Sequence, residues 1–156
     1  MHIITARVPE GVECLDEIHV IGGNCLHGNI TVQGSKNTVL PLMSGALLYR
    51  GISVLKACPR ITDVFYMEEI LRALGAETWW EDHDLYLDCT HADGSHVPEI
   101  YSGRMRSSII LLGPILARNQ RAEIGYPGGC VIGKRPVDLH LYVLRRFGAE
   151  IKEEEK

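Results

Sequence analysis

One short loop carries the residues of this chain that are best suited to chemistry. Cys130 lies in the stretch 128–135, which reads Gly-Gly-Cys-Val-Ile-Gly-Lys-Arg. The glycines let the backbone approach a ligand closely, and the two cations that follow create a positive field that lowers the pKa of a thiol. A helix predicted to begin at Pro136 adds to this field. The pattern indicates a reactive cysteine that attacks an anionic substrate or gives it a proton; the alternative is a flexible loop with an incidental cysteine.

Two further segments combine cations with a helix start. Lys36 and Asn37 follow Gly34-Ser35 at the beginning of an apolar run, and free N–H groups at a helix N-terminus bind anions. The upstream glycine spacing of a Walker A loop is absent. Arg104 and Arg106 precede another helix and could clamp a phosphate. For both segments the alternative is an ordinary, solvated helix start.

The cysteines and histidines form no standard metal pattern. Cys89, His91 and His96 have no zinc-type spacing and no fourth ligand nearby, so we expect no metal and no cofactor. The five cysteines are an odd number without a C-x-x-C pair. This argues against a disulfide framework and suits a reducing cytoplasm.

The elements that must position these residues follow from periodicity and turn residues. Strands are predicted at 18–21, 29–33, 52–55 and 122–125, with a hairpin of 77–80 and 85–87. Helices are predicted at 39–49, 63–74, 106–118 and 136–147. Ser35 or Asn37 is the expected N-cap of the first helix, with Pro41 in its first turn. The third helix should tighten near Gly113-Pro114.

The second half of the chain repeats the first. Residues 71–77 match residues 144–150 at an offset of 73, and residues 47–50 match residues 115–118 at an offset of 68. The two offsets differ by 73 − 68 = 5, which predicts that the second copy carries five additional residues within 128–134. Loops added to a repeated scaffold are common places for function.

Length and charge exclude several classes of protein. The chain has 156 residues, of which 46% are hydrophobic and 23% charged, as in one soluble domain. Sixteen Lys and Arg against 20 Asp and Glu argue against a nucleic-acid-binding protein. No run approaches 18 apolar residues, and residues 1–16 lack the pattern of a secretory signal, so we expect a cytoplasmic protein.

Several motifs resemble one family. Between about Glu17 and Ile151, the chain is similar to the UDP-N-acetylglucosamine 1-carboxyvinyltransferases, the enolpyruvyl transferases of early peptidoglycan synthesis. The Pro-Gly-Gly-Cys and Arg-Pro-Val-Asp-Leu-His motifs are the most specific. The sibling enzymes of the shikimate pathway share the fold but lack this cysteine loop. The motifs stand at residues 22–24, 34–37, 105–109, 112–114, 127–133 and 135–140.

The resemblance implies an α/β fold of repeated βαβαββ units, the inside-out α/β barrel of enolpyruvyl transferases. The family has two domains of three units each, and this chain is truncated to about two units. Residues 1–16 then form a leader without a family counterpart, and residues 17–33 belong to the other domain. Residues 34–156 form a partial first domain, with repeats at about 34–100 and 101–156.

The resemblance also implies a reaction and a site. The enolpyruvyl group of phosphoenolpyruvate moves to the 3-hydroxyl of UDP-N-acetylglucosamine and phosphate leaves. Cys130 is implied as a general acid that forms a covalent adduct and is alkylated by fosfomycin. The implied phosphoenolpyruvate ligands are Lys36, Asn37 and Arg135. The implied UDP-N-acetylglucosamine ligands are Arg106, Arg135, Pro136, Val137, Asp138 and Leu139.

The chain departs from the family in ways that limit its expected activity. Phe65 stands where the family has an aspartate, and the family's base for the sugar hydroxyl has no counterpart here. We therefore expect no turnover from this chain alone; the alternatives are a non-catalytic UDP-sugar-binding fragment or a truncated gene product. Incomplete repeats should leave apolar side chains uncovered on the strands next to the missing unit and on the helices at 39–49 and 106–118, with self-association as the result. No nucleic-acid or membrane partner is expected.

Overall fold

The computed structural model describes residues 3–4, 20–23, 25, 27–128 and 136–153 and divides into two units, 1–32 and 33–156. In the first unit, β1 (Ile3–Ile4) pairs antiparallel with β2 (Val20–Ile21). The strand predicted at 18–21 is therefore confirmed at its last two residues, and residues 18–19 lie outside the described part.

The strand predicted at 29–33 is wrong. These residues have no regular structure, and the side chains of Ile30 and Val32 are 90% and 83% exposed. An alternating sequence becomes a strand only where a neighbouring strand completes its backbone hydrogen bonds. Sequence alternation alone does not supply that neighbour.

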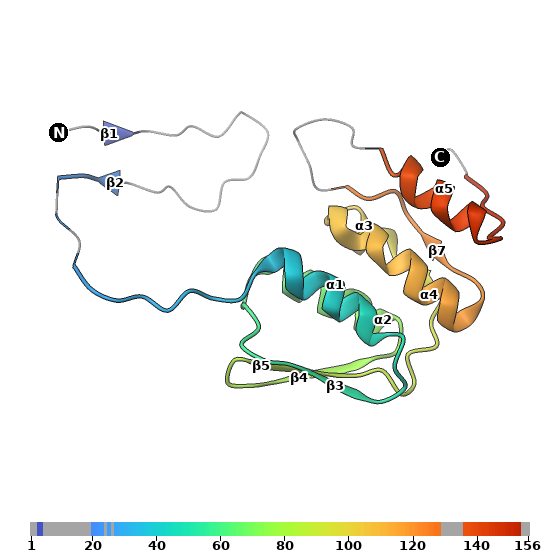
Figure 1. Cartoon of the computed structure of the whole chain (residues 1–156), viewed down its shortest axis with the longest axis horizontal. Helices are drawn as coiled ribbons and strands as arrows, with labels where there is room; N and C mark the ends of the chain where they lie inside the picture. Colours follow the sequence, from blue (N-terminus) through green and yellow to red (C-terminus); the bar gives the residue numbers. More distant parts are fainter. Residues whose placement is uncertain (1–2, 5–19, 24, 26, 129–135, 154–156) are drawn as a thin grey trace. The chain divides into compact units, whose positions relative to one another are not determined.

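The second unit is a mixed α/β structure (Figure 1). Its first part contains α1 (Lys36–Ala46), β3 (Ile52–Leu55), α2 (Thr62–Ala73), β4 (Glu77–Glu81) and β5 (Asp84–Asp88). Its second part contains β6 (His96–Val97), α3 (Glu99–Ser102), the 3-10 helix η1 (Arg106–Leu111), α4 (Leu112–Asn119), β7 (Glu123–Ile124) and α5 (Asp138–Arg146). We call residues 36–88 the first repeat and residues 96–153 the second repeat.

Helix α1 begins at Lys36, which confirms one of the two predicted N-cap residues. Ser35 is its N-cap, and the carbonyl of Ser35 accepts the N–H of Thr38 and of Val39 at 3.1 and 3.0 Å. Pro41 is therefore the sixth helical residue, in the second turn and not the first. Since proline has no N–H, the carbonyl of Asn37 receives no helical hydrogen bond from it.

The helix predicted at 106–118 is tightened over residues 106–111 and not near Gly113-Pro114, where it was expected. Residues 106–111 form a 3-10 helix, and α4 continues from Leu112. Pro114 cannot donate to the carbonyl of Ile110, four residues earlier. That carbonyl accepts a hydrogen bond from the Ser44 hydroxyl of α1 at 3.0 Å. The proline therefore opens a site through which the two repeats bond to each other.

A three-stranded sheet of order β3-β5-β4 forms the floor of the first repeat, with α1 and α2 over one face (Figure 1). Both strand pairs are antiparallel, which confirms the predicted hairpin. Its turn has Asp82 at φ 49°. Leu85 and Leu87 of the central strand are fully buried, whereas Trp79 stacks on Tyr86 with ring centroids 5.1 Å apart. The alternation of β5 therefore separates the core from the outer face.

The core between the sheet and the helices is centred on α2. Val64, Met67, Ile70 and Leu71 are all 0% exposed, at the spacing of three and four residues that the sequence predicted. Each such side chain contributes about 1.5–3 kcal/mol by leaving water. Glu68 is also buried, and its carboxylate accepts hydrogen bonds from the side chains of Arg72, Thr78 and Trp80.

The offset of 73 is a structural repeat, whereas the offset of 68 is not. Helices α2 and α5 both end at a glycine with positive φ, Gly75 at 97° and Gly148 at 94°. In both, the N–H after the glycine donates to the carbonyl five residues earlier, at 2.9 and 3.0 Å, which is the Schellman arrangement. Residues 47–50, by contrast, lie beyond the end of α1, whereas residues 115–118 lie inside α4.

Arg118 of α4 ties the two repeats together. Only 4% of its side chain is exposed. Its guanidinium donates to the carbonyls of Leu47, Cys89 and Thr90 at 2.8, 2.6 and 3.1 Å. These carbonyls follow α1 and β5, so one side chain joins three segments of the core.

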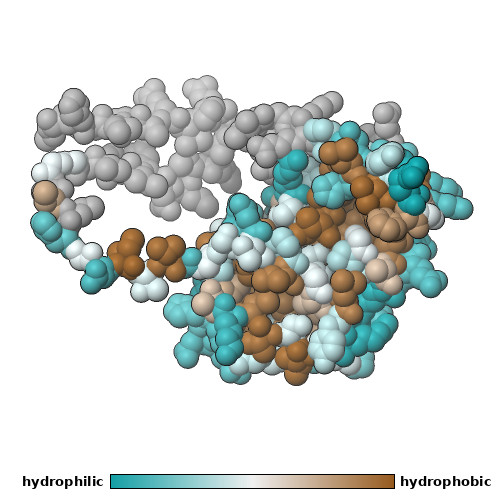
Figure 2. Space-filling model, in the orientation of Figure 1, coloured by the Kyte–Doolittle hydropathy of each residue, from teal (hydrophilic) through white to brown (hydrophobic). Residues whose placement is uncertain are grey.

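Exposed apolar side chains lie on one of the two predicted helices and also on α5. Leu48 and Tyr49, just after α1, are 62% and 61% exposed, as expected for the first helix. Large apolar side chains at 106–118 are instead buried or half-buried, because this segment packs on α1 and α3. Leu139 and Phe147, in and after α5, are 72% and 85% exposed, and apolar side chains show as brown patches over this unit in Figure 2. No helix in the described part is long and apolar enough to cross a bilayer.

Candidate functional site

The N-terminus of α1 presents a cation beside free backbone donors. Lys36 is the first helical residue, and its Nζ lies 3.3 Å from Oδ2 of Asp63 in the first turn of α2. The two side chains are 49% and 37% exposed, and α1 has no acidic residue in its own first turn. An ion pair this exposed is weak. An anion arriving at the helix N-terminus can therefore compete with Asp63 for Lys36.

Helix α2 connects this cation to the arginine segment. Asp63 and Tyr66 are three residues apart and so lie on the same side of α2. The guanidinium of Arg104 lies over the Tyr66 ring, 5.8 Å from its centroid. Arg106, half-exposed, begins η1 two residues later. One side of α2 therefore contacts both basic segments that the sequence singled out.

The cysteine loop leaves the fold beside the same arginines. The N–H of Gly128 donates to the carbonyl of Ser102 at 3.2 Å. A Cβ at residue 128 would collide with the carbonyl of Gly103, so only glycine fits this approach. Arg104 is the next residue along the chain. Cys130, like Arg135, lies outside the described residues, as does the predicted insertion apart from Gly128.

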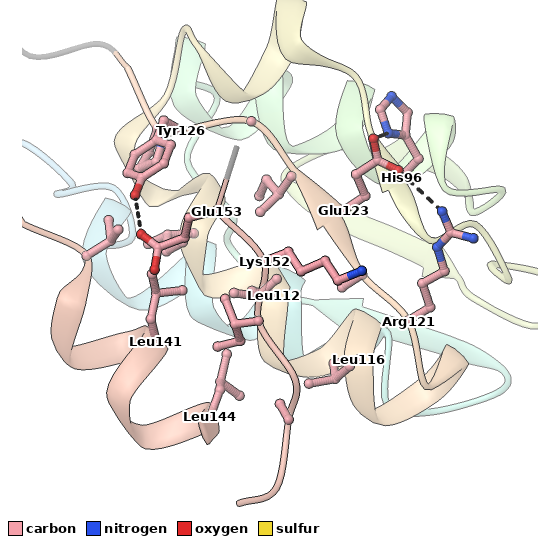
Figure 3. A pocket seen from close by; sticks show the side chains of 18 of the residues that line it. His96, Leu112, Leu116, Arg121, Glu123, Tyr126, Leu141, Leu144, Lys152 and Glu153 are labelled. Carbon is pink, nitrogen blue, oxygen red and sulfur yellow. Dashed lines mark hydrogen bonds and ion pairs between the residues drawn. The ribbon is translucent and has the colours of Figure 1, made fainter. Parts of the chain in front are cut away.

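The chain returns from the loop at the N-terminus of α5. Pro136, Asp138 and Leu139 are exposed there, and half-buried Val137 is the N-cap residue. Asp138 stabilises the helix start, because a carboxylate interacts favourably with the positive end of the helix dipole. Tyr126, Pro127 and Val137, from both sides of the loop region, line one groove (Figure 3).

Two features of this region were not predicted. Asp63 was not identified as a partner of Lys36, although an acidic residue in a first helical turn was a visible signal. Tyr66 was not identified as the platform for Arg104. Phe65, which the resemblance places where the family has an aspartate, lies on another side of α2 and meets the Trp80 ring at a centroid distance of 6.2 Å. Two residues along a helix rotate a side chain by about 200°, so Phe65 cannot share the side of Asp63.

The cysteine and histidines considered for a metal do not converge. Cys89 is fully buried, and burial raises the pKa of its thiol above the ordinary value. His96 instead pairs with Glu123, with 3.3 Å between Nδ1 and Oε1. Within the described ranges, no three histidine, cysteine, aspartate or glutamate side chains are grouped to hold a metal ion.

Comparisons with known proteins point to one family. Residues 20–156 match the family model of EPSP synthase (3-phosphoshikimate 1-carboxyvinyltransferase). The chain is 41% identical over 139 residues to UDP-N-acetylglucosamine 1-carboxyvinyltransferase 2 of Caldanaerobacter subterraneus subsp. tengcongensis. This alignment covers 89% of the chain and 33% of the relative, so the chain spans about a third of that protein's length. The chain is also similar to a solved structure, the enolpyruvyl transferase NikO from Streptomyces tendae, with a TM-score of 0.59 and 27% sequence identity. This match covers 63% of the present chain and 23% of the NikO chain.

Proposed function

Because the chain belongs to the EPSP synthase family and has the enolpyruvyl transferase fold, we propose that it forms part of a UDP-N-acetylglucosamine 1-carboxyvinyltransferase. Such an enzyme moves the enolpyruvyl group of phosphoenolpyruvate to the 3-hydroxyl of the sugar and releases phosphate, in peptidoglycan synthesis. The observation that carries this proposal is the 41% identity to a protein of that name. The resemblance predicted from the cysteine loop and the Arg-Pro-Val-Asp-Leu-His motif is confirmed.

In the proposed reaction, the sugar hydroxyl adds to C2 of phosphoenolpyruvate and gives its proton to a base, while C3 takes up a proton from an acid. The bond from C2 to the phosphate oxygen then breaks, C3 loses a proton, and phosphate leaves. Cys130 is the proposed general acid at C3 and the residue that forms the covalent adduct. Its loop begins beside Arg104, so a positive field surrounds the start of the loop. Such a field lowers the pKa of a thiol, which makes the thiol a stronger proton donor, and it attracts the anionic substrate.

Lys36, Asn37 and Arg135 are the proposed ligands of phosphoenolpyruvate. Support for Lys36 comes from its place at the N-terminus of α1, where its charge adds to that of the helix end. Asn37 is exposed in the same turn. The weak pair with Asp63 keeps Lys36 in position until a stronger anion replaces the carboxylate.

Arg106 and residues 135–139 are the proposed ligands of UDP-N-acetylglucosamine. Arg106 is half-exposed close to the base of the cysteine loop, and residues 136, 138 and 139 are exposed where the loop returns. Arginine suits a diphosphate because its planar guanidinium makes paired hydrogen bonds. Exposed backbone N–H groups at the start of α5 can bind a further oxygen.

We also propose that residues 34–156 are a partial first domain with two repeats and that the protein is cytoplasmic. The shared ends of α2 and α5 support the repeats. Free thiols at Cys25, Cys58 and Cys89 support a reducing compartment.

Ligand binding to the 156-residue chain tests the proposal. UDP-N-acetylglucosamine and phosphoenolpyruvate are titrated by NMR into the parent chain, Lys36→Met and Arg50→Met. Arg50→Met is the control, because this substitution also removes one positive charge, but beyond the opposite end of α1. Loss of one charge-assisted contact costs about 1.5–3 kcal/mol, so Lys36→Met should weaken phosphoenolpyruvate binding about 10- to 100-fold. Unchanged affinity would rule out Lys36 as a ligand.

Two further measurements separate the alternatives. Shikimate 3-phosphate replaces the UDP-sugar in one titration, since the family model takes its name from that acceptor. Preferential binding of shikimate 3-phosphate would contradict the proposed substrate. Phosphate release is then measured with both substrates present; binding without release is the result expected of a fragment that binds the UDP-sugar but lacks the base.

A further inference from the structure

The β4–β5 hairpin holds the loop between β3 and α2 in place. The carbonyl of Asp82 accepts a hydrogen bond from the Arg60 guanidinium at 2.8 Å. The carbonyl of His83 accepts the N–H of Cys58 at 2.7 Å. The Arg60 guanidinium also lies over the Trp80 ring of β4, 4.8 Å from its centroid. Two successive residues of the hairpin turn therefore anchor the loop.

A third hydrogen bond from the hairpin holds a left-handed residue of this loop. The Asp84 carboxylate accepts the N–H of Ala57 at 2.9 Å, and Ala57 has φ 50°. A residue with a Cβ is strained in this conformation, which persists only where neighbouring groups hold it. Asp84 is half-buried at the start of β5 and pairs with Glu81 of β4. Its carboxylate therefore has a fixed place from which to hold Ala57.

The carbonyl of this left-handed residue meets the chain that enters α1. A Cβ added at Gly34 would lie 2.8 Å from the carbonyl oxygen of Ala57 and 3.3 Å from Cδ of Pro59. Gly34 therefore packs directly on the loop, and a larger residue fits there only after a shift. Ser35 is the N-cap of α1, and Lys36 is its first residue. The contact thus lies two residues before the cation that is proposed to bind phosphoenolpyruvate.

The same loop leads directly into α2, which supplies the partner of Lys36. Ile61 is the N-cap residue of α2, and Asp63 in its first turn lies 3.3 Å from Nζ of Lys36. The hairpin turn and the start of α1 lie at the same end of this unit (Figure 1). The loop thus places both the backbone that carries the cation and the carboxylate that faces it.

We propose that Asp84 is a positioning residue for Lys36 and Asn37, acting through Ala57 and Gly34. The identity of the ligand, phosphoenolpyruvate, rests on the proposed function, whereas the path from the hairpin to the helix start rests on the contacts above. Groups that are already in place bind a ligand more tightly, because less conformational entropy is lost on binding. Without Asp84, the helix start keeps its charge but loses its fixed position.

Four variants separate the hydrogen bond of Asp84 from its charge. Asp84→Ala removes the acceptor, whereas Asp84→Asn removes the charge and keeps an oxygen that can accept the N–H of Ala57. Asp88→Ala is the matched control, since Asp88 ends the same strand and its carboxylate accepts the N–H of Thr90 at 2.9 Å. The fourth variant combines Asp84→Ala with Ala57→Gly, because glycine adopts a positive φ without strain and should restore the loop.

Hydrogen exchange without ligand measures the helix start. The amides of residues 38 and 39 donate to the N-cap carbonyl of α1. In Asp84→Ala their exchange should quicken at least about fivefold, whereas unchanged exchange at residues 67–71 of α2 verifies the fold. Asp84→Asn, Asp88→Ala and the double variant should match the parent chain. Equal quickening in Asp84→Asn, or none in Asp84→Ala, would overturn the proposal.

Titration with phosphoenolpyruvate, followed by NMR, tests the effect on the ligand. Asp84→Ala should weaken binding at least about threefold, whereas Asp84→Asn and Asp88→Ala should bind like the parent chain. Gly34→Ala displaces the same contact and leaves the hairpin unchanged. It should therefore quicken exchange at residues 38 and 39 and weaken binding, even if Asp84→Ala does not fold.

The two measurements distinguish failure of this inference from failure of the proposed function. Quickened exchange with unchanged affinity would overturn the positioning role of Asp84 and leave the proposed function standing. No binding to the parent chain would contradict the proposed function, and the exchange pattern would still decide whether Asp84 holds the start of α1.

Discussion

Replacement of Arg118 by methionine should destabilise the chain far more than the same replacement of Arg50. Both arginines approach Asp93, at 3.3 Å from Arg118 and 3.0 Å from Arg50. The side chain of Arg118 is 4% exposed, however, and that of Arg50 is 58% exposed. The matched pair therefore separates a buried cation from an exposed one with a common carboxylate.

The expected magnitude follows from the carbonyls that Arg118 leaves behind. It donates to three backbone oxygens at 2.6–3.1 Å, and a hydrogen bond to a charged group is worth about 1.5–3 kcal/mol. Three such bonds would sum to about 4.5–9 kcal/mol, but water can enter and solvate part of the site. We therefore expect Arg118→Met to lower the free energy of unfolding by about 3 kcal/mol. Arg50→Met should remain within about 0.5 kcal/mol of the parent chain.

Urea denaturation followed by circular dichroism measures the difference. With a slope of about 2 kcal/mol per molar urea, the Arg118→Met midpoint should fall by about 1.5 M. Hydrogen exchange should also quicken at the ends of α1 and β5, where the three carbonyls lie. A difference of less than about 1 kcal/mol between the two variants would show that Arg118 does not hold the repeats together.

Three other predictions concern single groups. Burial raises the pKa of the Cys58 thiol from 9.0 to about 11, so below pH 9 the thiolate fraction in the native chain is about 100-fold lower than that of an exposed cysteine. Alkylation of Cys58 should therefore be at least about 100-fold slower in the native chain than in urea. Gly148→Ala should lower the free energy of unfolding, measured by thermal denaturation, by about 1 kcal/mol because of the positive φ alone. Gly75→Ala should lower it by more, because the added Cβ would also lie 2.8 Å from a backbone oxygen. Equal losses in the two variants would contradict this reasoning. The hydrogen bond from Tyr126 lowers the pKa of Glu153 below 4.5, so the stability from this carboxylate is present above pH 4.5 and lost as pH falls through the lowered value. Tyr126→Phe should raise the NMR titration midpoint of Glu153.

Features that depend on residues close in sequence were predicted well. The hairpin around Asp82 and the apolar side of α2 are as expected, and α2 and α5 end within one residue of the predicted ends. Each depends on a turn, a helical period or a cap within about five residues. The misplaced Pro41 shows the limit of this reasoning, because the first residue of a helix depends on small local energies.

Features that depend on distant neighbours were not predicted. Residues 29–33 alternate like a strand, yet in the described structure they have no strand to pair with. Phe65 was recognised as a departure, but its packing on Trp80, in the hairpin, was not visible in the sequence. The roles proposed for Cys130 and Arg135 rest on the family resemblance, since both residues lie outside the described part.

The sequence by itself determined the family, the periodic helices and which cations are candidates for the substrates. The tertiary structure decided which groups meet: Lys36 with Asp63, Arg104 with Tyr66, and Arg118 with carbonyls from two distant segments. The physical reason is that caps and periods are encoded within a few residues, whereas contacts between elements exist only after the elements pack. Their partners are then set by burial and hydrogen bonding across the whole core.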